Sequence, residues 1–599
     1  MASRGLLLHD LLVLLGPDAA CPESLQLVRE ALLAGAFEQA LAGVAEDLRQ
    51  RPSDPQALVL GADAFNAYGQ SLQALELIQR ARAGIPSLEG LQLVEAQQLS
   101  LLGRHEEALL LLEPLLQRDT VLADARAMAL VRQHLSRVFL ALQRPEQALE
   151  TLQPLLDGGV SPETPSDLAE LAAELMLTLQ RPVDALPWAE QAHRDLDTPA
   201  SARRLAGCHF LLDAQESYGQ VLRQSVETWP QDGELAALAA LALFDLPDPV
   251  EGWALLQSAA QHAGTSAALR FVEARQHLIR GDFARGWSAY EARLELPENN
   301  LYAPCPPGWR DQSPRGRTVV VVAEQGVGDV LFFSRFLVPL QHDASRVVLV
   351  VEPRLMPLLQ RSYPAVVVLD QVELARGLAG PDALWIPLGS LPLHYGCDRT
   401  AISSGGTQIQ LQTSPRLREH WRLRLQAEAA PGARIGISLT AGGAQQDYQS
   451  RKRSVDPQLV LTPLQDQPVT LIDLQHRGRL EPEQTGAAGS PPVLRFEEIT
   501  RDLDQLCALI TQLDLLITSD QTNAFLGGML GIRTLVIAPP NPHFMLMDQG
   551  ERSPWFDSIR IVRAARWRDW QSVAEAYGAQ LAQSLAERSS RGSGMYASS

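Results

Sequence analysis

Several features that would mark a membrane, disulfide-rich or nucleic-acid-coating protein are scarce in this sequence. No apolar run reaches the roughly 18 residues that a membrane-spanning helix requires, so no span is predicted. Acidic residues outnumber basic ones, with 70 Asp and Glu against 51 Lys and Arg, and the formal net charge is −19. A protein that coats nucleic acid needs a basic surface, so general nucleic-acid binding is disfavoured.

Cysteine and aromatic residues are also few. The 5 cysteines lie far apart, and no two have the spacing of a zinc site or redox motif. Their odd number gives no disulfide framework, so we expect buried thiols in a reducing cytoplasm. No DxD-type paired carboxylate stands out for a metal, and no cofactor is expected. Aromatic residues make up only 6%, which favours helices packed by aliphatic side chains.

The N-terminal segment, residues 1–24, imitates a signal peptide. However, His9 and Asp10 interrupt its apolar run, and no clear small-residue cleavage site follows. We interpret this segment as a short amphipathic helix, with a lipid-surface anchor as the alternative.

What the chain does contain is ordinary globular composition and an internal repeat. It has 599 residues, 46% hydrophobic and 20% charged, which allows three to four domains of roughly 150 residues. A phrase beginning with glycine and followed by an alanine recurs, and that alanine advances by 34 residues twice, from Ala40 to Ala74 to Ala108. Looser copies place Ala148, Ala185 and Gly286 at the same point of the phrase.

This pattern predicts a pair of antiparallel helices in each repeat. Glycine, or a proline just after the turn, separates the two helices, and the alanine lies where the helices cross closely. The period and these positions resemble tetratricopeptide repeats over residues 25–295. Such an array implies a groove for an extended peptide or a partner protein. Alternatively, the array supports the second half or dimerises, and assembly into a homo-oligomer is left open.

After residue 296 the sequence changes character. A Pro-rich linker, 296–316, is followed by short β-branched runs that alternate with helical patterns, which predicts parallel sheets. We expect two Rossmann-like halves at 317–430 and 431–575, with a helix end and a disordered tail at 576–599. Ligands of such sheets bind beyond the carboxyl ends of the strands. The expected strands are 317–323, 346–351, 365–369, 383–387, 434–439, 469–474, 513–519 and 534–538.

The strongest local motif, EQGVGD at 324–329, directly follows the first expected strand. Its glycines allow a sharp turn and a close approach to a ligand. A helix from about Val330 would point its N–H groups into the same cleft and favour an anion there. The alternative for Asp329 is a helix N-cap without a chemical role.

Seven segments taken together, and in this order, resemble bacterial tetratricopeptide-repeat proteins with a C-terminal heptosyltransferase-like domain. They are 281–293, 308–309, 324–329, 388–392, 451–454, 514–531 and 553–556. The resemblance covers about 281–570 and implies an all-α repeat array followed by an α/β GT-B fold. It also implies inverting transfer of a sugar from a nucleotide-sugar to a protein or glycan that the repeat groove presents, without a metal.

The resemblance also implies roles for individual residues. Asp329 matches the catalytic base, which takes the proton of the acceptor hydroxyl. The implied donor-binding residues are Gly326, Gly328, Lys452, Arg453, Ser519, Asp520, Gln521, Thr522 and Asn523, and the implied acceptor or cleft residues are Glu324, Gln325 and Arg335. The alternatives are a solvated loop at 451–453 and a strand-end turn residue at Asp520.

One departure from the resembled family bears on activity. The family carries a histidine five residues after the second-domain aspartate, where this chain has Phe525, and 438–443 also departs from its pattern. The nearest histidines, His476 and His543, are expected to be surface residues rather than substitutes. Phe525 motivates a second hypothesis, a catalytically inactive scaffold. A third is an accessory protein of small-molecule or polysaccharide export that uses its repeats for assembly.

Overall fold

A computed structural model shows how the chain folds. It describes residues 23–84, 89–116, 125–246, 249–262, 266–296, 309, 312–395, 411–441, 448–476, 480, 489–566 and 569–594. The chain divides into two compact units, Met1–Tyr218 and Gly219–Ser599. The predicted helix at 1–24 lies almost wholly outside the described residues, as does most of the Pro-rich linker.

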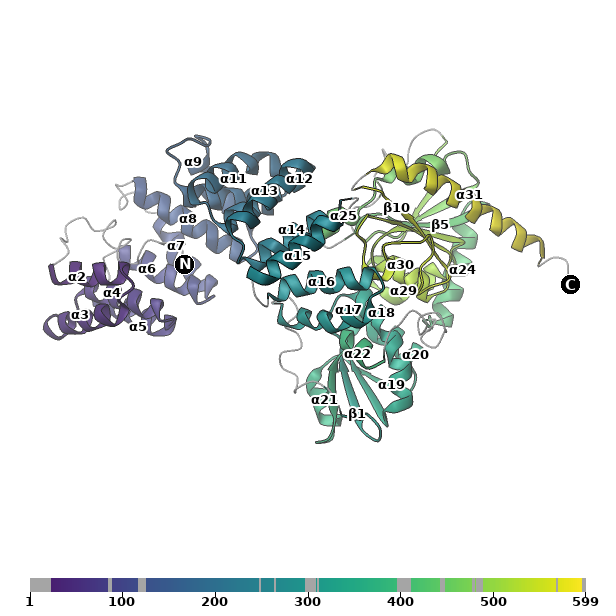
Figure 1. Ribbon diagram of the computed structural model, residues 1–599, viewed down its shortest axis with the longest axis horizontal. Helices are drawn as coiled ribbons and strands as arrows, with labels where there is room; N and C mark the ends of the chain where they lie inside the picture. The colour runs from purple at the N-terminus through teal and green to yellow at the C-terminus, as the bar shows by residue number, and fades with distance from the viewer. Residues whose placement is uncertain are drawn as a thin grey trace. The chain divides into compact units, whose positions relative to one another are not determined.

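The first unit consists of helical hairpins of the predicted tetratricopeptide type (Figure 1). Each hairpin pairs two consecutive helices. The pairs are α2 (Glu23–Leu33) with α3 (Phe37–Gln50), α4 (Pro55–Ala67) with α5 (Ser71–Gly84), α6 (Glu89–Leu101) with α7 (His105–Leu116), α8 (Ala125–Ala141) with α9 (Pro145–Leu156), and α10 (Ser166–Thr178) with α11 (Pro182–Leu196). Helix α12 (Pro199–Leu211) follows, and α13 (Gln215–Thr228) spans the boundary to the second unit.

Small residues at the predicted repeat positions are buried where the helices cross. The alanines at these positions are wholly inaccessible to solvent in five repeats: Ala40, Ala74, Ala108, Ala148 and Ala185. In the last repeat, a Cβ on Gly286 would lie 2.5 Å from Leu278 Cδ2, so an alanine there would force the leucine side chain to shift. Glycine replaces alanine at this position of the last repeat because the two helices of that repeat approach each other more closely there.

The turns between helices share a left-handed residue. In the first three repeats it is a glycine, with φ between 71° and 78° (Gly35, Gly103, Gly69). In three later turns a residue with a Cβ takes the same conformation, with φ between 57° and 60° (Gln143, Gln180, Asp213). The copy at Asp213 is not apparent in the sequence, because Asp213 and Tyr218 occupy the positions of the repeat's glycine and alanine.

The second unit begins with two more hairpins. Helix α14 (Gly233–Phe244) pairs with α15 (Val250–His262), and α16 (Ala267–Ile279) pairs with α17 (Phe283–Tyr290). These helices read as repeats in the sequence but belong to the same compact unit as the sheets. The reason is a continuous apolar core in which Leu278, Trp287 and Tyr290 pack with residues of both sheets.

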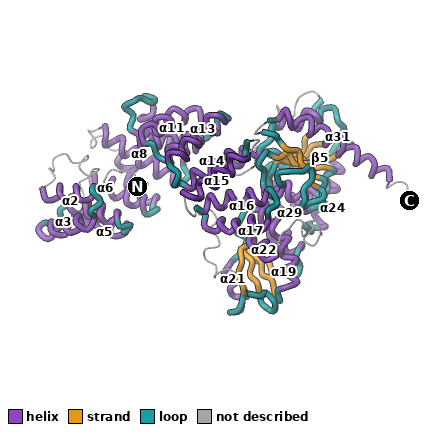
Figure 2. Tube along the Cα trace, viewed as in Figure 1, coloured by secondary structure: helices purple, strands orange, loops and turns teal. Residues whose placement is uncertain are grey.

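The second unit contains two separate, wholly parallel sheets (Figure 2), as predicted for an α/β region. The first has the order β3-β2-β1-β4, and the second has the order β10-β9-β8-β5-β6-β7. The first sheet comprises β1 (Thr318–Val322), β2 (Arg346–Val350), β3 (Val366–Leu369) and β4 (Leu384–Pro387). The second comprises β5 (Ala433–Ser438), β6 (Val469–Asp473), β7 (Val493–Arg495), β8 (Leu515–Ser519), β9 (Thr534–Ala538) and β10 (Ile559–Arg563).

Helices connect the strands and carry the loops that face the site. They include α18 (Val327–Phe333), α24 (Pro415–Glu428), α25 (Tyr448–Arg453), α28 (Glu498–Arg501), α29 (Leu503–Ile510), α30 (Thr522–Met529) and the short η4 (Pro353–Leu355) and η7 (Phe544–Leu546). Helix α18, which follows β1, contacts α30, which follows β8, so the two sheets approach each other at the carboxyl ends of these strands.

Three local expectations need correction. Helix α18 begins at Val327 rather than near Val330, and its N-cap is Gly326, so Asp329 lies in the first turn and is not the cap. Helix α31 (Trp570–Gly594) also extends through most of the segment 576–599 in which a disordered tail was expected. Its alanine, glutamate and arginine residues suit a helix better than their polarity suggested. Within the described residues, no helix is long and apolar enough to cross a membrane.

The left-handed glutamines predict a stabilising substitution. Residues with a Cβ lose about 1 kcal/mol in this conformation, and glycine does not. We expect Gln143→Gly to raise the free energy of unfolding by about that amount, measured by urea unfolding followed by far-ultraviolet circular dichroism. The matched control is Gln147→Gly, an exposed position inside α9, which should lower it by up to about 1 kcal/mol. Equal effects of both substitutions would contradict the assignment.

Candidate functional site

A buried ion pair joins the three motifs nearest the site. Arg293 follows α17 and Glu324 follows β1, and their side chains are 0% and 1% exposed, with Arg293 Nη2 2.8 Å from Glu324 Oε1. The same carboxylate oxygen accepts the N–H of Gly389, and Arg293 Nη2 also donates to Ser390 Oγ at 2.8 Å. Burial disfavours the charged guanidinium, but the carboxylates of Glu324 and Glu291 outweigh it and raise the pKa of Arg293.

Aromatic rings pack around this junction. Trp287 of α17 meets Phe333 of α18 edge to face, with ring centroids 5.8 Å apart, and meets Phe544 of η7 at 5.5 Å. Each such pair contributes about 0.5–1.5 kcal/mol beyond its buried area. The last repeat hairpin is therefore fixed to elements of both sheets, and it forms a rigid wall beside the EQGVGD motif.

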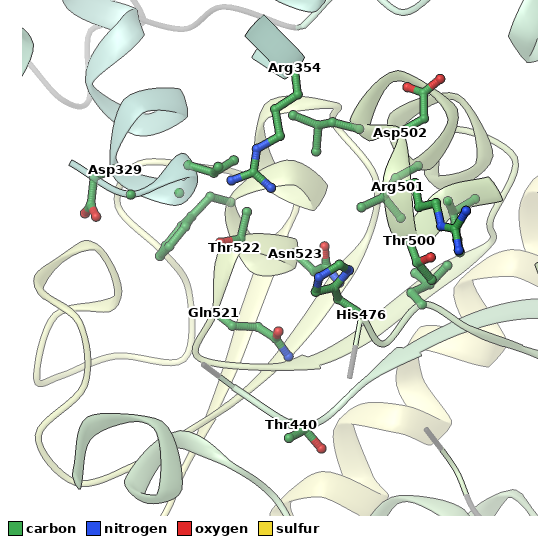
Figure 3. A pocket seen from close by; sticks show the side chains of 18 of the residues that line it. Asp329, Arg354, Thr440, His476, Thr500, Arg501, Asp502, Gln521, Thr522 and Asn523 are labelled. Carbon is green, nitrogen blue, oxygen red and sulfur yellow. The ribbon is translucent and has the colours of Figure 1, made fainter. Parts of the chain in front are cut away.

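The larger of two adjoining pockets has a volume of about 450 Å³. It is lined by residues that follow strands of both sheets, as expected for parallel α/β folds. Figure 3 shows Arg354 of η4 directed into it, and Asp329 at its edge with the carboxylate turned away from the middle. The polar lining residues are Asp329, Arg354, Thr440, Arg453, His476, Thr500, Arg501, Asp502, Gln521, Thr522, Asn523 and His543.

A smaller pocket of about 150 Å³ lies on the other side of Asp329. It shares Asp329, Arg453 and His543 with the larger pocket. Its remaining walls come from the last repeat hairpin and the loops beside it: Phe271, Arg275, Tyr290, Gln325 and Phe544. Asp329 is thus the one carboxylate among the described lining residues that faces both pockets.

The amino end of α30 forms the floor of the larger pocket. Gln521 and Asn523 line the pocket, and both side chains are fixed by Ser438. The Gln521 amide donates to the backbone oxygen of Ser438 at 2.7 Å, and the Asn523 amide donates to its hydroxyl at 2.8 Å. Gly328 lies close by, because a Cβ there would be 3.2 Å from Thr522 Oγ1. The backbone N–H groups that begin α30 therefore face a space suited to an anion.

The two neighbouring cations of α25 have different surroundings. Arg453 lines both pockets. Lys452, the only lysine of the chain, is buried and forms an ion pair with Asp245 at the end of α14. Burial lowers the pKa of Lys452, and Asp245 partly offsets this. The structure therefore brings Arg453, but not Lys452, to the predicted donor site.

Other predicted residues are placed behind the lining. Ser519 and Asp520 are wholly buried, and Asp520 Oδ2 accepts the backbone N–H of His543 at 2.7 Å. Glu324 is sequestered by Arg293, as described above. Arg335 is also buried, with its guanidinium over the rings of Phe332, Trp555 and Phe556.

Gln325 is the member of the predicted acceptor group that reaches a pocket. Its amide nitrogen donates to Tyr290 Oη at 2.8 Å. Burial raises the pKa of that tyrosine, so its hydroxyl stays protonated. Gln325 therefore ties the Gly-rich turn to the last repeat hairpin.

Several residues that line the pockets have no recognisable signal in the sequence. Arg354, Arg501 and Arg275 follow no motif and differ in no way from surface arginines of amphipathic helices. Arg275 is half-buried, and burial lowers the pKa of its guanidinium, as does nearby Arg453. Among the described residues it makes no hydrogen bond or ion pair, so its donors face the smaller pocket.

The two histidines differ from each other. His476 lines the larger pocket and is exposed, as expected. His543 is not a surface residue, because its side chain is 16% exposed and its Nε2 lies 3.3 Å from Asp329 Oδ1. No group of three or more His, Cys, Asp or Glu suited to a metal occurs in the described part of the chain.

Comparisons with known proteins show partial likenesses. No protein-family model matches the sequence. Protein FlbA of Caulobacter vibrioides is 26% identical over 360 residues, which are 55% of this chain and 58% of that protein. The chain therefore spans little more than half the length of this curated relative.

Two solved structures illustrate the fold-level likenesses. A tetratricopeptide repeat protein from Parabacteroides merdae covers 41% of this chain and 94% of its own, at 15% identity and a TM-score of 0.33. A family 9 glycosyl transferase from Veillonella parvula covers 46% and 99%, at 12% identity and a TM-score of 0.34. The functional conclusion therefore rests on the geometry of the pockets.

The buried pair predicts a large stability effect. Glu324→Gln leaves Arg293 buried without its main counter-charge, which typically costs about 3–5 kcal/mol. We expect this loss in urea unfolding followed by near-ultraviolet circular dichroism, to which the packed rings of Trp287 and Trp555 contribute. The control is Glu419→Gln, which removes an exposed pair with Arg422 and should change stability little. A loss no larger than the control's would contradict the central role of the pair.

Proposed function

We propose that this protein is a glycosyltransferase of the GT-B type, which transfers a sugar with inversion from a nucleotide-sugar to an acceptor hydroxyl. One observation carries the proposal. Asp329 lines both a pocket whose floor is the amino end of α30 and a smaller pocket walled by the last repeat hairpin. A base must stand between donor and acceptor in this way if it is to serve the bond formed between them.

The donor would occupy the larger pocket. Its volume of about 450 Å³ lies within the range of small-molecule sites. Arg453 and the N–H groups at the start of α30 would hold the phosphate, where negative charge grows as the sugar–oxygen bond breaks. The proposal thus assigns the phosphate charge to protein groups rather than to a metal. Arg354, Arg501 and His476 would contact other parts of the nucleotide.

The reaction is a single displacement. Asp329 takes the proton of the acceptor hydroxyl as the acceptor oxygen bonds to the anomeric carbon. The bond from that carbon to the phosphate oxygen breaks, and the nucleotide leaves with the electron pair. Protonated Asp329 then releases its proton to solvent, so the charges balance over the turnover.

The acceptor would occupy the smaller pocket. Phe271 and Tyr290 offer apolar faces, and Arg275 offers guanidinium donors that no described residue engages. All three belong to the last hairpin of the repeat series, α16 and α17, so this hairpin would contact the acceptor. The tetratricopeptide-like part supports a protein or peptide partner.

A non-catalytic scaffold is the second candidate. Phe525 favours it, because this buried ring stands where the resembled family carries a histidine and offers no hydrogen bond to a donor. A scaffold of this kind would retain the repeat array and lose affinity for nucleotide-sugars.

The proposed base predicts a specific loss of activity. Asp329→Asn keeps the shape of the side chain but cannot take a proton, so kcat should fall roughly 10²- to 10⁴-fold. Release of nucleotide from a panel of nucleotide-sugars, with cell extract as the acceptor source, measures this. Asp370→Asn is the control, an exposed aspartate that also follows a strand. Undiminished turnover by Asp329→Asn would show that Asp329 is not the base, and the absence of calorimetric binding of every donor to the wild type would favour the scaffold.

Two arginine substitutions test the division between the pockets. Arg453→Met should weaken binding of the preferred nucleoside diphosphate roughly 10-fold, because it removes a charged contact to phosphate worth about 1.4 kcal/mol. Arg275→Met removes the same charge from the acceptor side and should leave this affinity unchanged. Isothermal titration calorimetry measures both. Equal effects would place the phosphate between the two arginines and overturn the assignment of the smaller pocket.

A further inference from the structure

His543 lies at the centre of the site although it belongs to no motif. It follows β9 in the loop that begins η7, and its Nε2 lies 3.3 Å from Asp329 Oδ1. Both side chains are largely shielded, at 16% and 27% exposed. Contacts of this kind commonly tighten when substrate binds. The imidazole therefore borders the carboxylate to which the proposed function assigns proton transfer.

The other ring nitrogen decides what His543 can do. Nδ1 accepts the backbone N–H of Met545 at 3.4 Å, so in the neutral ring we assign the proton to Nε2. The protonated Nε2 then lies 3.3 Å from Asp329 Oδ1, which is close enough for the ring to donate after a small adjustment. With one nitrogen accepting and the other protonated, the ring has no lone pair to take a substrate proton. The geometry therefore suits a donor to the base rather than a second base.

Four contacts hold the ring and its loop in this place. Asp520, wholly buried, accepts the backbone N–H of His543 at 2.7 Å. The imidazole lies against Phe544 and Phe525, with ring centroids 4.2 and 5.6 Å away. Two residues earlier, Asn541 Oδ1 accepts from Gln276 Nε2 of α16 at 3.0 Å. The loop is thus anchored to both the second sheet and the last repeat hairpin.

We propose that His543 is a positioning residue for Asp329, and this rests on the proposed transferase function. Its Nε2–H holds one carboxylate oxygen, which leaves the other oxygen to take the acceptor proton. Asp520 acts one step further back by holding the His543 backbone. Phe525, which replaces a histidine of the resembled family, supplies an apolar face for this imidazole, which comes from a different loop.

Substitution of His543 should lower turnover without weakening donor binding. We expect His543→Ala to lower kcat about 100-fold at nearly constant KM for the nucleotide-sugar. Added imidazole should restore part of the lost kcat, and His543→Gln, whose amide N–H can reach Asp329, should retain more activity than His543→Ala. His342→Ala, an exposed histidine of the first sheet domain, is the control and should keep wild-type kinetics.

The pairing with Asp329 has its own test. The double variant Asp329→Asn/His543→Ala should be no slower than Asp329→Asn alone, because His543 acts through that carboxylate. Wild-type kcat in His543→Ala, no rescue by imidazole or glutamine, or additive losses in the double variant would each overturn the proposal. Thermal unfolding of every variant separates these outcomes from misfolding.

A readout that needs no turnover separates this inference from the transferase proposal. In protein labelled with ¹⁵N-histidine, the His543 resonances, assigned from their loss in His543→Gln, should show the Nε2-protonated tautomer. They should shift in Asp329→Asn while those of His342 do not. An Nδ1-protonated ring, or one insensitive to Asp329→Asn, would overturn the positioning role even if the protein proves to be a transferase. If no nucleotide-sugar is turned over but the ring behaves as described, the pairing stands and the transferase proposal fails.

Discussion

The buried ion pair between Arg293 and Glu324 is the constraint on which the site depends. Two charges removed from water are tolerated only when they satisfy each other and their remaining hydrogen bonds, and here Gly389 and Ser390 complete the set. The pair fixes the end of α17 against the turn after β1, and that turn carries Gly326, Gly328 and Asp329. Glu324, which the sequence suggested as a cleft residue, therefore anchors and orients the motif. Asp329, five residues later, faces the pockets.

This anchoring makes the last repeat hairpin part of the α/β unit. Trp287 and Tyr290 pack into the aromatic cluster between α18 and η7. Gln276 donates a hydrogen bond to the loop that carries His543. In an ordinary repeat array each hairpin contacts only its neighbours. Here the last hairpin packs its outer face against the sheets, and Phe271, Arg275 and Tyr290 of this hairpin line the smaller pocket. The boundary between repeats and sheets in the sequence is thus not a boundary of the site.

Charge is distributed unevenly in this acidic protein. With a net charge of −19, the chain nevertheless gathers Arg275, Arg354, Arg453 and Arg501 around two adjoining pockets. Its single lysine does not join them, because Lys452 is paired with Asp245 and fastens α25 to the repeat helix α14. Of these two neighbouring cations, Lys452 therefore positions α25, and Arg453 faces the pocket. Such a locally basic recess is what a phosphate-bearing ligand requires.

Local patterns in the sequence were sufficient for much of the fold and part of the site. The repeat glycines and alanines, the eight apolar runs and the Gly-rich turn each determine structure over a few residues. The family resemblance, not these patterns alone, pointed to Asp329, Arg453 and Gln521–Asn523, which line the larger pocket. Strands β7 and β10 escaped, since one is only three residues long and the other, IRIVR, is interrupted by arginine. Only the tertiary structure decided that Glu324, Arg335, Lys452, Ser519 and Asp520 lie behind the lining and that Arg275 and His543 belong to it. The physical reason is that these roles depend on contacts between segments up to hundreds of residues apart, such as Gln276 with Asn541, and no local pattern encodes a partner so distant.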